Sequence, residues 1–331
     1  MDPLTHTATG LFLSRAGLNR LTPRAAPILM LAANAPDIDI LTTAGGPLNY
    51  LHYHRHLTHS LVALPVLAFL TVALVWAVSR GPVRWGGAWL AACIAVGSHL
   101  LLDLTNVYGI RLLLPFSGAW YRLDLNGLID FWIWGAFLLG VAGPFLSRLV
   151  SSEISARKPV SATYGRGFAF FALGFLLLYD GGRALLHARA METLDARLYQ
   201  GAAPDRVVAI PGMNPLLWRG LVETGRFYEV APLDLTGAFD PDSGIIFDKA
   251  SPDPAIAAAR RNSAFRQFLT FSQFPLWRVT PLSEPQGARQ VEIFDMRFGT
   301  PVQPGFMIRG VLDAGGKMIQ TSFRFGRPSP R

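Results

Sequence analysis

A short stretch of the chain gathers side chains of the kind that bind metal ions. Residues 34–60 read NAPDIDILTTAGGPLNYLHYHRHLTHS, in which two aspartates precede four histidines: Asp37, Asp39, His52, His54, His56 and His59. The whole chain has seven histidines, so more than half of them lie in this one cluster. Imidazole and carboxylate together suit zinc and other first-row divalent metals. The stretch therefore predicts a metal site.

A second pair of such side chains lies much further along the chain. His99 and Asp103 belong to GSHLLLD, at the end of a long apolar segment, and their spacing puts them on one face of a helix. Ionisable side chains inside a membrane span are costly and by default functional. The alternative is that His99 only hydrogen-bonds Asp103 or a neighbouring helix. Two separated sets of histidine and aspartate, however, are what a metal site requires.

The side chains predicted to hold metal are His6, Asp37, Asp39, His54, His59, His99 and Asp103. The spacing of the four clustered histidines does not allow all of them to bind one ion, so we expect His52 and His56 to be bystanders. His6 alone would not indicate a metal site, and we include it only because the other candidate ligands are present. The two aspartates of the cluster could instead cap a helix and lie in a solvated turn.

The residues predicted to take part in catalysis are Asp39, Arg55 and His59. Arg55 cannot be a metal ligand, but a guanidinium beside a metal suits an anionic oxygen of a phosphate or carboxylate. Asp124 and Asp130 could orient histidines from outside the ligand shell. Equally, Asp124 could lie in a solvated loop.

Other catalytic chemistries lack the residues that they need. The chain has no Walker loop, no GxGxxG after a strand and no GxSxG turn. Cys93 is the single cysteine, which excludes an internal disulfide and a cysteine-based zinc site. Water activated by a divalent metal is the chemistry that remains, with zinc favoured and one or two ions expected.

The composition is that of a membrane protein. Of the 331 residues, 51% are hydrophobic and only 16% are charged, whereas charged residues make up about a quarter of a typical soluble chain. The net charge of +8 would suit nucleic acid, but the basic residues are scattered rather than gathered in a stripe. We therefore interpret them as membrane flanks and expect no nucleic-acid partner. The polar N-terminus predicts no signal peptide.

Four apolar stretches meet the requirement of about 20 residues for crossing a bilayer. They cover approximately residues 60–79, 86–104, 127–148 and 167–187. Two shorter helices, over residues 3–18 and 23–33, precede them. The predicted fold begins with a mainly α membrane domain, residues 1–190, of about four transmembrane helices plus these short N-terminal helices.

Beyond residue 190, prolines, charges and alternating patterns replace the long apolar runs. Strands are predicted at residues 207–210, 216–223, 226–235, 290–298, 306–313 and 317–325. Residues 254–270 predict one amphipathic helix, and the sequence DAGG at 313–316 predicts a hairpin turn. We therefore expect residues 191–331 to form a soluble antiparallel α+β domain, whose role the sequence does not indicate.

Five motifs occur in an order that is specific in combination: Thr5-His6 with Gly10, NAPDID (34–39), HRHLTHS (54–60), GSHLLLD (97–103) and TNVYGIRLLLPF (105–116). Together they resemble the YdjM-like family of membrane-bound, metal-dependent hydrolases, closely over residues 1–135. The resemblance implies a multi-span protein of the bacterial inner membrane. His56 stands where that family usually has glycine, and it either adds a ligand or crowds the site. A more distant similarity to zinc-dependent phospholipase C, carried by the His-x3-Asp pair, implies a phosphoester substrate.

Four spans would place the N-terminus, the loop 105–126 and the C-terminal domain on one side of the membrane, together with the predicted ligands. Basic residues slightly favour the cytoplasmic side. The main hypothesis is a membrane-bound hydrolase acting on a phosphoester or lipid-like substrate at the membrane surface, with membrane lipid and a small-molecule or lipid substrate as partners. The competing hypothesis is a non-catalytic metal-binding scaffold whose C-terminal domain recruits a partner. A transporter is less favoured, because no internal repeat is visible.

Overall fold

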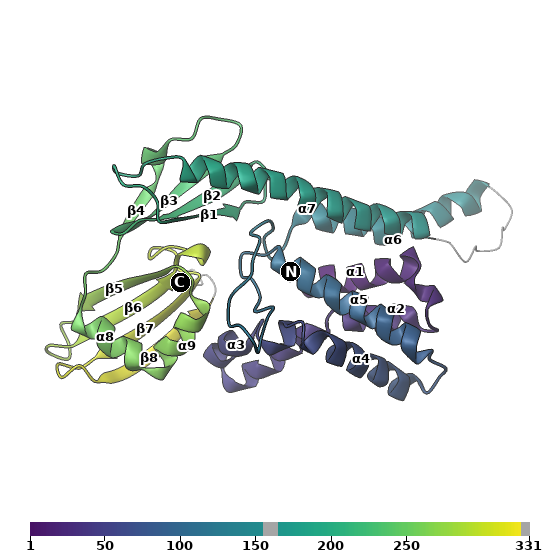
Figure 1. Ribbon diagram of the computed structural model, residues 1–331, viewed down its shortest axis with the longest axis horizontal. Coiled ribbons are helices and arrows are strands. Elements are labelled where there is room, and N and C mark those ends of the chain that lie inside the picture. The colour runs from purple at the N-terminus through teal and green to yellow at the C-terminus, as the bar shows by residue number, and fades with distance from the viewer. Residues whose placement is uncertain (155–164, 326–331) are drawn as a thin grey trace. The chain divides into compact units, whose positions relative to one another are not determined.

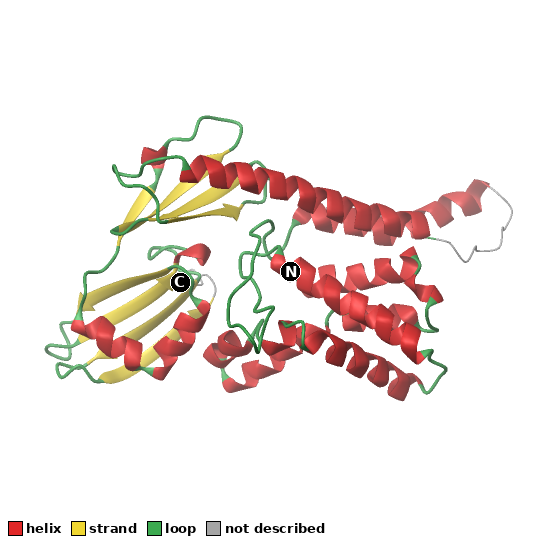
Figure 2. Ribbon diagram, viewed as in Figure 1, coloured by secondary structure: helices red, strands yellow, loops and turns green. Residues whose placement is uncertain are grey.

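The computed structural model describes residues 1–154 and 165–325, and the chain divides into two compact units (Figures 1 and 2). The first unit comprises Met1–Asp39, Arg55–Arg189 and Pro211–Leu217, and the second comprises Ile40–His54, Ala190–Ile210 and Trp218–Arg331. The domain boundary predicted at residue 190 stays a prediction. Two short segments, 40–54 and 211–217, depart from that simple division.

The first unit is helical. Its α-helices are α1 (Pro3–Ala16), α2 (Ala25–Ala32), α4 (Ala63–Ser79), α5 (Trp85–Leu104), α6 (Phe131–Ile154) and most of α7 (Arg166–Asp195). Three 3-10 helices connect them, namely η1 (Leu18–Arg20), η2 (Ala35–Gly45) and η3 (Leu57–His59). The helix α3 (Pro47–Tyr53) belongs to the second unit.

Three helices of the described residues are long and apolar enough to cross a membrane, within α5, α6 and α7. The first predicted span, 60–79, is the shorter helix α4, and the helical segment 47–59 meets it at a bend of 89°. The bend lies at Ser60, whose backbone is extended after η3. The described chain thus has three candidate spans, or four if the bent pair crosses the bilayer as one broken span. The expectation of a membrane domain with about four spans followed by an antiparallel α+β part is confirmed.

Small residues allow the helices of the first unit to pack closely. The buried face of α5 is made of Ala88, Ala91, Ala92, Ala95 and Val96, at helical spacing, and it packs with buried residues of α2 and α4. Small side chains at such contacts let helix backbones approach one another in a membrane protein. Near the C-terminal end of α5, the buried face also carries the polar side chains of His99 and Asp103.

The second unit contains two four-stranded antiparallel sheets in which each strand pairs with the next along the chain. The first sheet consists of β1 (Arg206–Pro211), β2 (Leu217–Glu223), β3 (Phe227–Asp234) and β4 (Ile245–Asp248). The second consists of β5 (Pro275–Pro281), β6 (Arg289–Asp295), β7 (Phe306–Leu312) and β8 (Met318–Phe325). The predicted hairpin turn joins β7 to β8, where Gly316 donates its amide to Asp313 O at 2.9 Å.

Three details of the second unit differ from the sequence prediction. The predicted helix 254–270 is two helices, α8 (Pro254–Arg261) and α9 (Ser263–Phe271), because Asn262 is extended and its side chain caps α9 at Ala264 N. The strand predicted at 290–298 ends at Asp295, whose carboxylate caps the 3-10 helix η5 (Met296–Phe298). The strands β4 and β5 were not predicted, since β4 is very short and β5 has a proline at each end.

Candidate metal centre

The last turns of α5 carry His99 and Asp103, which lie on one helix face as their spacing predicts. Both side chains are fully buried, and His99 Nε2 lies 3.5 Å from Asp103 Oδ2. Burial of two ionisable groups is unfavourable unless each finds a charged or polar partner. The partners come from segments that are distant in the sequence.

The 3-10 helices η2 and η3 bring Asp37 and His59 to this end of α5. Asp37 lies in the first turn of η2, directly after Pro36, and His59 is the last residue of η3. The side chain of Asn34 donates to Thr7 Oγ1 at 2.9 Å and to Met30 O at 2.8 Å, which ties the start of this segment to α1 and α2.

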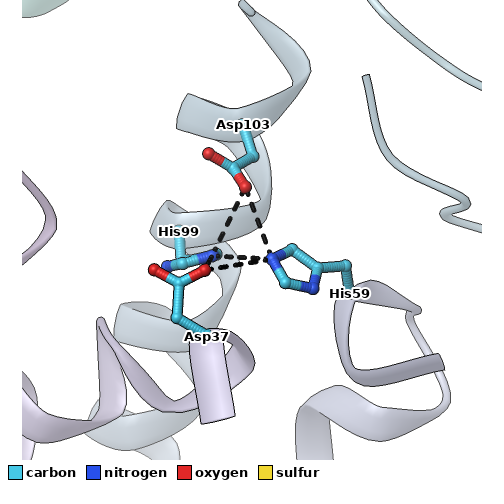
Figure 3. A group of neighbouring side chains, drawn as sticks. All are labelled: Asp37, His59, His99 and Asp103. Atoms are coloured by element: carbon cyan, nitrogen blue, oxygen red, sulfur yellow. Dashed lines mark hydrogen bonds and ion pairs between the residues drawn. The ribbon is translucent and has the colours of Figure 1, made fainter. Parts of the chain in front are cut away.

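Four ligand atoms converge on one point (Figure 3). Nε2 of His59 and Nε2 of His99 are 3.2 Å apart. Asp103 Oδ2 lies 3.4 and 3.5 Å from these two nitrogens, and Asp37 Oδ1 lies 3.5 and 3.7 Å from them. In a tetrahedral zinc site, ligand distances of about 2.0–2.1 Å place neighbouring ligand atoms about 3.3–3.4 Å apart. The cluster therefore has the spacing of a cage around one small divalent ion.

The other ring nitrogen of each histidine, Nδ1, contacts a polar group on the side of the ring that faces away from the other ligand atoms. His99 Nδ1 lies 2.7 Å from Ala33 O, and His59 Nδ1 lies 3.1 Å from Thr58 Oγ1 and 3.4 Å from Asp39 Oδ2. A carbonyl or carboxylate partner keeps the proton on Nδ1 and leaves the lone pair of Nε2 for a metal. Both imidazoles are thus oriented as ligands.

Asp39 lies on the far side of His59 from the point where the four atoms converge. It is buried, and its Oδ2 accepts a hydrogen bond of 2.9 Å from the amide of Arg55. An oxygen of Asp39 also lies within 4.8 Å of one of Asp37, so the two aspartates could share a second ion. The contacts with Arg55 and His59 show a supporting position, while the predicted role of Asp39 as a ligand stays a prediction.

His6 on α1 contacts two members of the cluster, His99 and Asp103. Its ring stacks on that of His99 with centroids 3.8 Å apart, and its Nε2 lies 3.4 Å from Asp103 Oδ1. Both of its ring nitrogens are buried without a hydrogen-bond partner among the described residues. Burial and the neighbouring His99 lower the pKa of His6 to about 4, so its ring is neutral at physiological pH. A neutral, unpaired imidazole suits metal binding.

Asp37 is charged in this environment. Burial alone would raise the pKa of its carboxyl, but the hydrogen bond between Asp37 and His59 and the neighbouring ring of His99 hold that pKa well below its usual value. Its side chain is 27% exposed, whereas those of the two histidines and Asp103 are buried almost completely. Asp37 is therefore the member of the four through which solvent reaches the cluster.

Arg55 supplies positive charge beside Asp103. Its Nη2 donates to Asp103 Oδ1 at 3.0 Å, and its guanidinium lies over the ring of Tyr108 at 5.0 Å. Its Nε and Nη1 are buried and make no hydrogen bond within the part of the chain that the structure describes. The backbone of Arg55 has a positive φ of 58°, and its amide is fastened to Asp39. These donors are oriented toward an acceptor that the described residues do not provide.

A second arginine, which the sequence analysis did not single out, stands behind the first. The amide of Arg111 donates to Arg55 O at 3.2 Å, and its Nη1 lies 3.0 Å from His56 Nε2. Its guanidinium lies over Trp120 at 5.0 Å. His56, predicted as a bystander, contacts this arginine. The motif TNVYGIRLLLPF held the signal, since it includes Tyr108 and Arg111.

The sequence also named His52, His54 and Asp124. His52 and His54 belong to residues 40–54 of the second unit, where His54 stacks on Tyr50 with centroids 4.5 Å apart. Its role as a ligand stays a prediction. Asp124 pairs with Arg122.

Asp130, the other aspartate considered as a support for histidines, has a helix-capping role. Its Oδ1 accepts from the amide of Trp132 at 2.9 Å at the start of α6, and Tyr179 donates to its Oδ2 at 2.9 Å. These contacts join α6 to α7.

The profile of the YdjM inner membrane proteins matches residues 1–190, which include every helix and polar side chain of the cluster. The chain belongs to the YdjM family. The match ends where α7 leaves the first unit, so the family is defined by the membrane part that carries the cluster. The expected location in the bacterial inner membrane agrees with this membership and with the apolar helices.

The chain is also similar to the uncharacterized protein YfhP of Bacillus subtilis (strain 168). The two are 25% identical over 316 residues, which cover 90% of this chain and 87% of YfhP. The similarity therefore extends beyond the YdjM match into the C-terminal unit. No solved structure matches the chain.

Proposed function

We propose that this YdjM-family protein is a membrane-bound, metal-dependent hydrolase. The observation that carries the proposal is the convergence of His59 Nε2 and His99 Nε2 with carboxylate oxygens of Asp37 and Asp103, at the spacing of a metal cage. Two imidazole Nε2 atoms and two carboxylate oxygens that face one point are the mixed nitrogen and oxygen donor set of a divalent metal site.

The four residues would hold one divalent ion, for which zinc is favoured by the mixed nitrogen and oxygen ligands. His6 Nε2 beside Asp103 Oδ1 offers a donor for a second ion, and the neighbouring oxygens of Asp37 and Asp39 offer others. A divalent ion held by these residues would lower the pKa of a bound water and would polarise an ester or phosphoester. Asp37, the partly exposed ligand, would lie on the side from which water and substrate approach.

The residues around the cluster support an anionic substrate. Arg55 presents two buried donors without a partner among the described residues, next to the ligand Asp103. A guanidinium in this position binds a phosphate or carboxylate oxygen and offsets its negative charge. The cluster lies at the end of a membrane-crossing helix, so a phosphoester or another lipid-like substrate could reach it from the bilayer surface.

One observation favours the alternative of a non-catalytic scaffold. Four protein ligands fill a tetrahedral zinc site, and closed sites of this kind are usually structural, whereas catalytic sites keep a position open. On this alternative the metal would hold α5, η2 and η3 together, and the C-terminal unit would recruit a partner. The two proposals agree on the ligands and differ on hydrolysis.

The first test is elemental analysis of the detergent-purified protein, prepared without chelators. Wild type is compared with the double variant His99→Ala/Asp103→Ala and with His52→Ala, which removes a histidine of the same sequence cluster from the second unit. We expect near-stoichiometric zinc or manganese in wild type and His52→Ala, and its loss in the double variant. No metal in wild type would overturn both proposals.

The second test separates the two proposals. Wild type, His59→Ala and Arg55→Met are assayed against chromogenic phosphoesters and fluorescent phospholipids. The hydrolase proposal expects turnover by wild type that is lost in both variants, with metal retained in Arg55→Met. A metal-loaded wild type that hydrolyses none of these compounds would support the scaffold instead.

A further inference from the structure

The loop between β1 and β2 has a composition that is unusual for a hairpin exposed to water. Residues 211–217 read PGMNPLL, and no charged residue occurs between Arg206 and Arg219. Met213 is 73% exposed, and Leu216 and Leu217 are also exposed. Hairpin loops in water are rich in glycine, asparagine and aspartate for their turn geometry, and polar elsewhere. Three large apolar side chains on one short loop require another explanation.

The loop belongs to the membrane unit, although the strands that it joins belong to the other unit. Residues Pro211–Leu217 cluster with the helices of the first unit. The indole nitrogen of Trp132 donates a hydrogen bond of 3.3 Å to Met213 O. Trp132 is the second residue of α6, at the beginning of the membrane-crossing stretch Phe131–Leu149. The hydrogen bond therefore places the loop at the level where a span enters the bilayer.

That level also exposes other apolar side chains of the first unit. Leu128, Ile129, Phe131 and Trp132 all present large apolar surfaces there. Tryptophan rings are typical of the headgroup level of membranes, because they are apolar with one polar edge. The loop thus continues an apolar surface that already belongs to the end of a span.

The backbone of the loop is suited to a region that is poor in water. Gly212 donates its amide to Leu217 O at 3.0 Å, and Leu217 donates back to Asn214 O at 3.0 Å. Leu216 donates to the side chain of Asn214 at 3.0 Å. Pro211 and Pro215 have no N–H to satisfy. Backbone groups that are paired internally lower the cost of approaching the hydrocarbon region.

We propose that residues 211–217 form a membrane anchor that inserts Met213, Leu216 and Leu217 at the boundary between headgroups and acyl chains. The partner is the lipid bilayer. The loop 105–130 connects the end of α5 to the start of α6, so the anchor lies on the membrane face that carries the metal centre. The inference does not depend on a bound metal or on hydrolysis.

The experiment uses the single cysteine of the chain. In a Cys93→Ala background, Met213→Cys is labelled with an environment-sensitive fluorophore, and the full-length protein is placed at one copy per disc in phospholipid nanodiscs. Discs with acyl chains brominated near the headgroup are compared with unbrominated ones. We expect a blue-shifted emission, loss of most of the fluorescence in brominated discs, and protection from aqueous iodide.

Two further cysteine variants keep the test decisive. Leu216→Cys repeats the measurement if a label at Met213 perturbs the loop, and the same quenching is expected. Val302→Cys, another highly exposed apolar position, controls for the fluorophore seeking lipid by itself, and we expect it to remain accessible to iodide. Water-like emission at both loop positions would overturn the proposal.

Discussion

The orientation of two imidazole rings decides what the cluster can do. The rings of His59 and His99 are each held at Nδ1, by Asp39 with Thr58 and by Ala33 O, and this directs both Nε2 atoms to one point. The groups behind the ligands therefore matter as much as the ligands. The same argument gives the two aspartates different roles. Asp39 contacts Nδ1 of His59 and orients that ring, whereas Asp37 contacts both Nε2 atoms and can itself be a ligand.

We predict that Asp39→Asn weakens the metal site without abolishing it. Loss of the negative charge behind His59 should reduce metal affinity by roughly 10–100-fold, as is typical for partners of metal-bound histidines. Competition against a chelator measures the affinity, and elemental analysis at saturating metal measures the stoichiometry. Loss of one full equivalent of metal would show that Asp39 is itself a ligand, and an unchanged affinity would exclude both roles.

A second residue-scale feature lies in the C-terminal unit. The side chain of Glu229 on β3 is almost fully buried, and its Oε1 has no hydrogen-bond partner among the described residues. Burial, with a contribution from Asp242, raises the pKa of this carboxyl from 4.5 to about 7. The folded unit therefore keeps the proton over a pH range in which the unfolded chain releases it.

We predict that the C-terminal unit loses stability as the pH rises from about 4.5 to 7 and that Glu229→Gln removes this loss. Above the unfolded pKa the unfolded state binds fewer protons, so the slope of stability with pH is negative. The effect is about 3 kcal/mol at most. Pulse proteolysis of the full-length protein in urea at pH 5 and pH 8 measures it, with the exposed Asp248→Asn as control. Equal stability of wild type and Glu229→Gln at pH 8 would contradict the prediction.

At the scale of elements, the site depends on how closely α1 crosses α2. A Cβ built on Gly10 would lie 2.5 Å from Leu29 O, so only glycine allows this approach of the two backbones. Gly10 is one turn beyond His6 on α1, and the contact therefore sets how His6 meets His99. The contact is a feature of helix packing that local sequence does not reveal.

We predict that Gly10→Ala destabilises the first unit by about 1–3 kcal/mol, the usual cost of overpacking a well-packed contact. Thermal unfolding in detergent measures the change, and metal content shows whether His6 has moved. Gly174→Ala in α7 is the matched control, because a Cβ there meets nothing within 4 Å. It should be neutral or stabilise by about 0.5–1 kcal/mol. Equal melting temperatures for the two variants would argue against the close contact.

At the scale of the whole molecule, the two units are not consecutive pieces of the chain. Residues 40–54, which include α3, pack with α9 and β8 of the second unit, and the loop 211–217 packs in the first. The stretch with the four histidines is thereby divided: His56 and His59 remain in the membrane unit, and His52 and His54 do not.

We predict that the metal centre faces the cytoplasm. In a Cys93→Ala background, Ala119→Cys in the exposed loop between α5 and α6 should resist a membrane-impermeant maleimide in intact cells and react after permeabilisation. Pro82→Cys, between α4 and α5 at the other end of the spans, should react in intact cells. The small excess of basic residues on the site side is the physical reason. The reverse labelling pattern would place the centre outside.

The part of the fold that was predicted follows from local signals. Apolar length identified the membrane helices, and alternation identified six of the eight strands. Local signals failed where the determining contact was short or tertiary. Asn262 ends α8 and its side chain caps the start of α9, which divides the predicted helix. The strand β4 is short and is defined by its pairing with β3. For the candidate site, the inventory of His and Asp was visible, whereas Tyr108 and Arg111 appeared only as part of the motif TNVYGIRLLLPF and were given no role of their own.

The sequence by itself determined that a membrane helix would present His99 and Asp103 on one face, because helical periodicity is a property of consecutive residues. It also determined which other side chains were available as ligands. Only the tertiary structure decided that His59 and Asp37 meet that pair, that His6 stacks on His99, and that Asp39 stands behind His59. These contacts form only when α1, η2, η3 and α5 pack together. Contacts between segments so far apart in the chain produce no periodic pattern in the sequence.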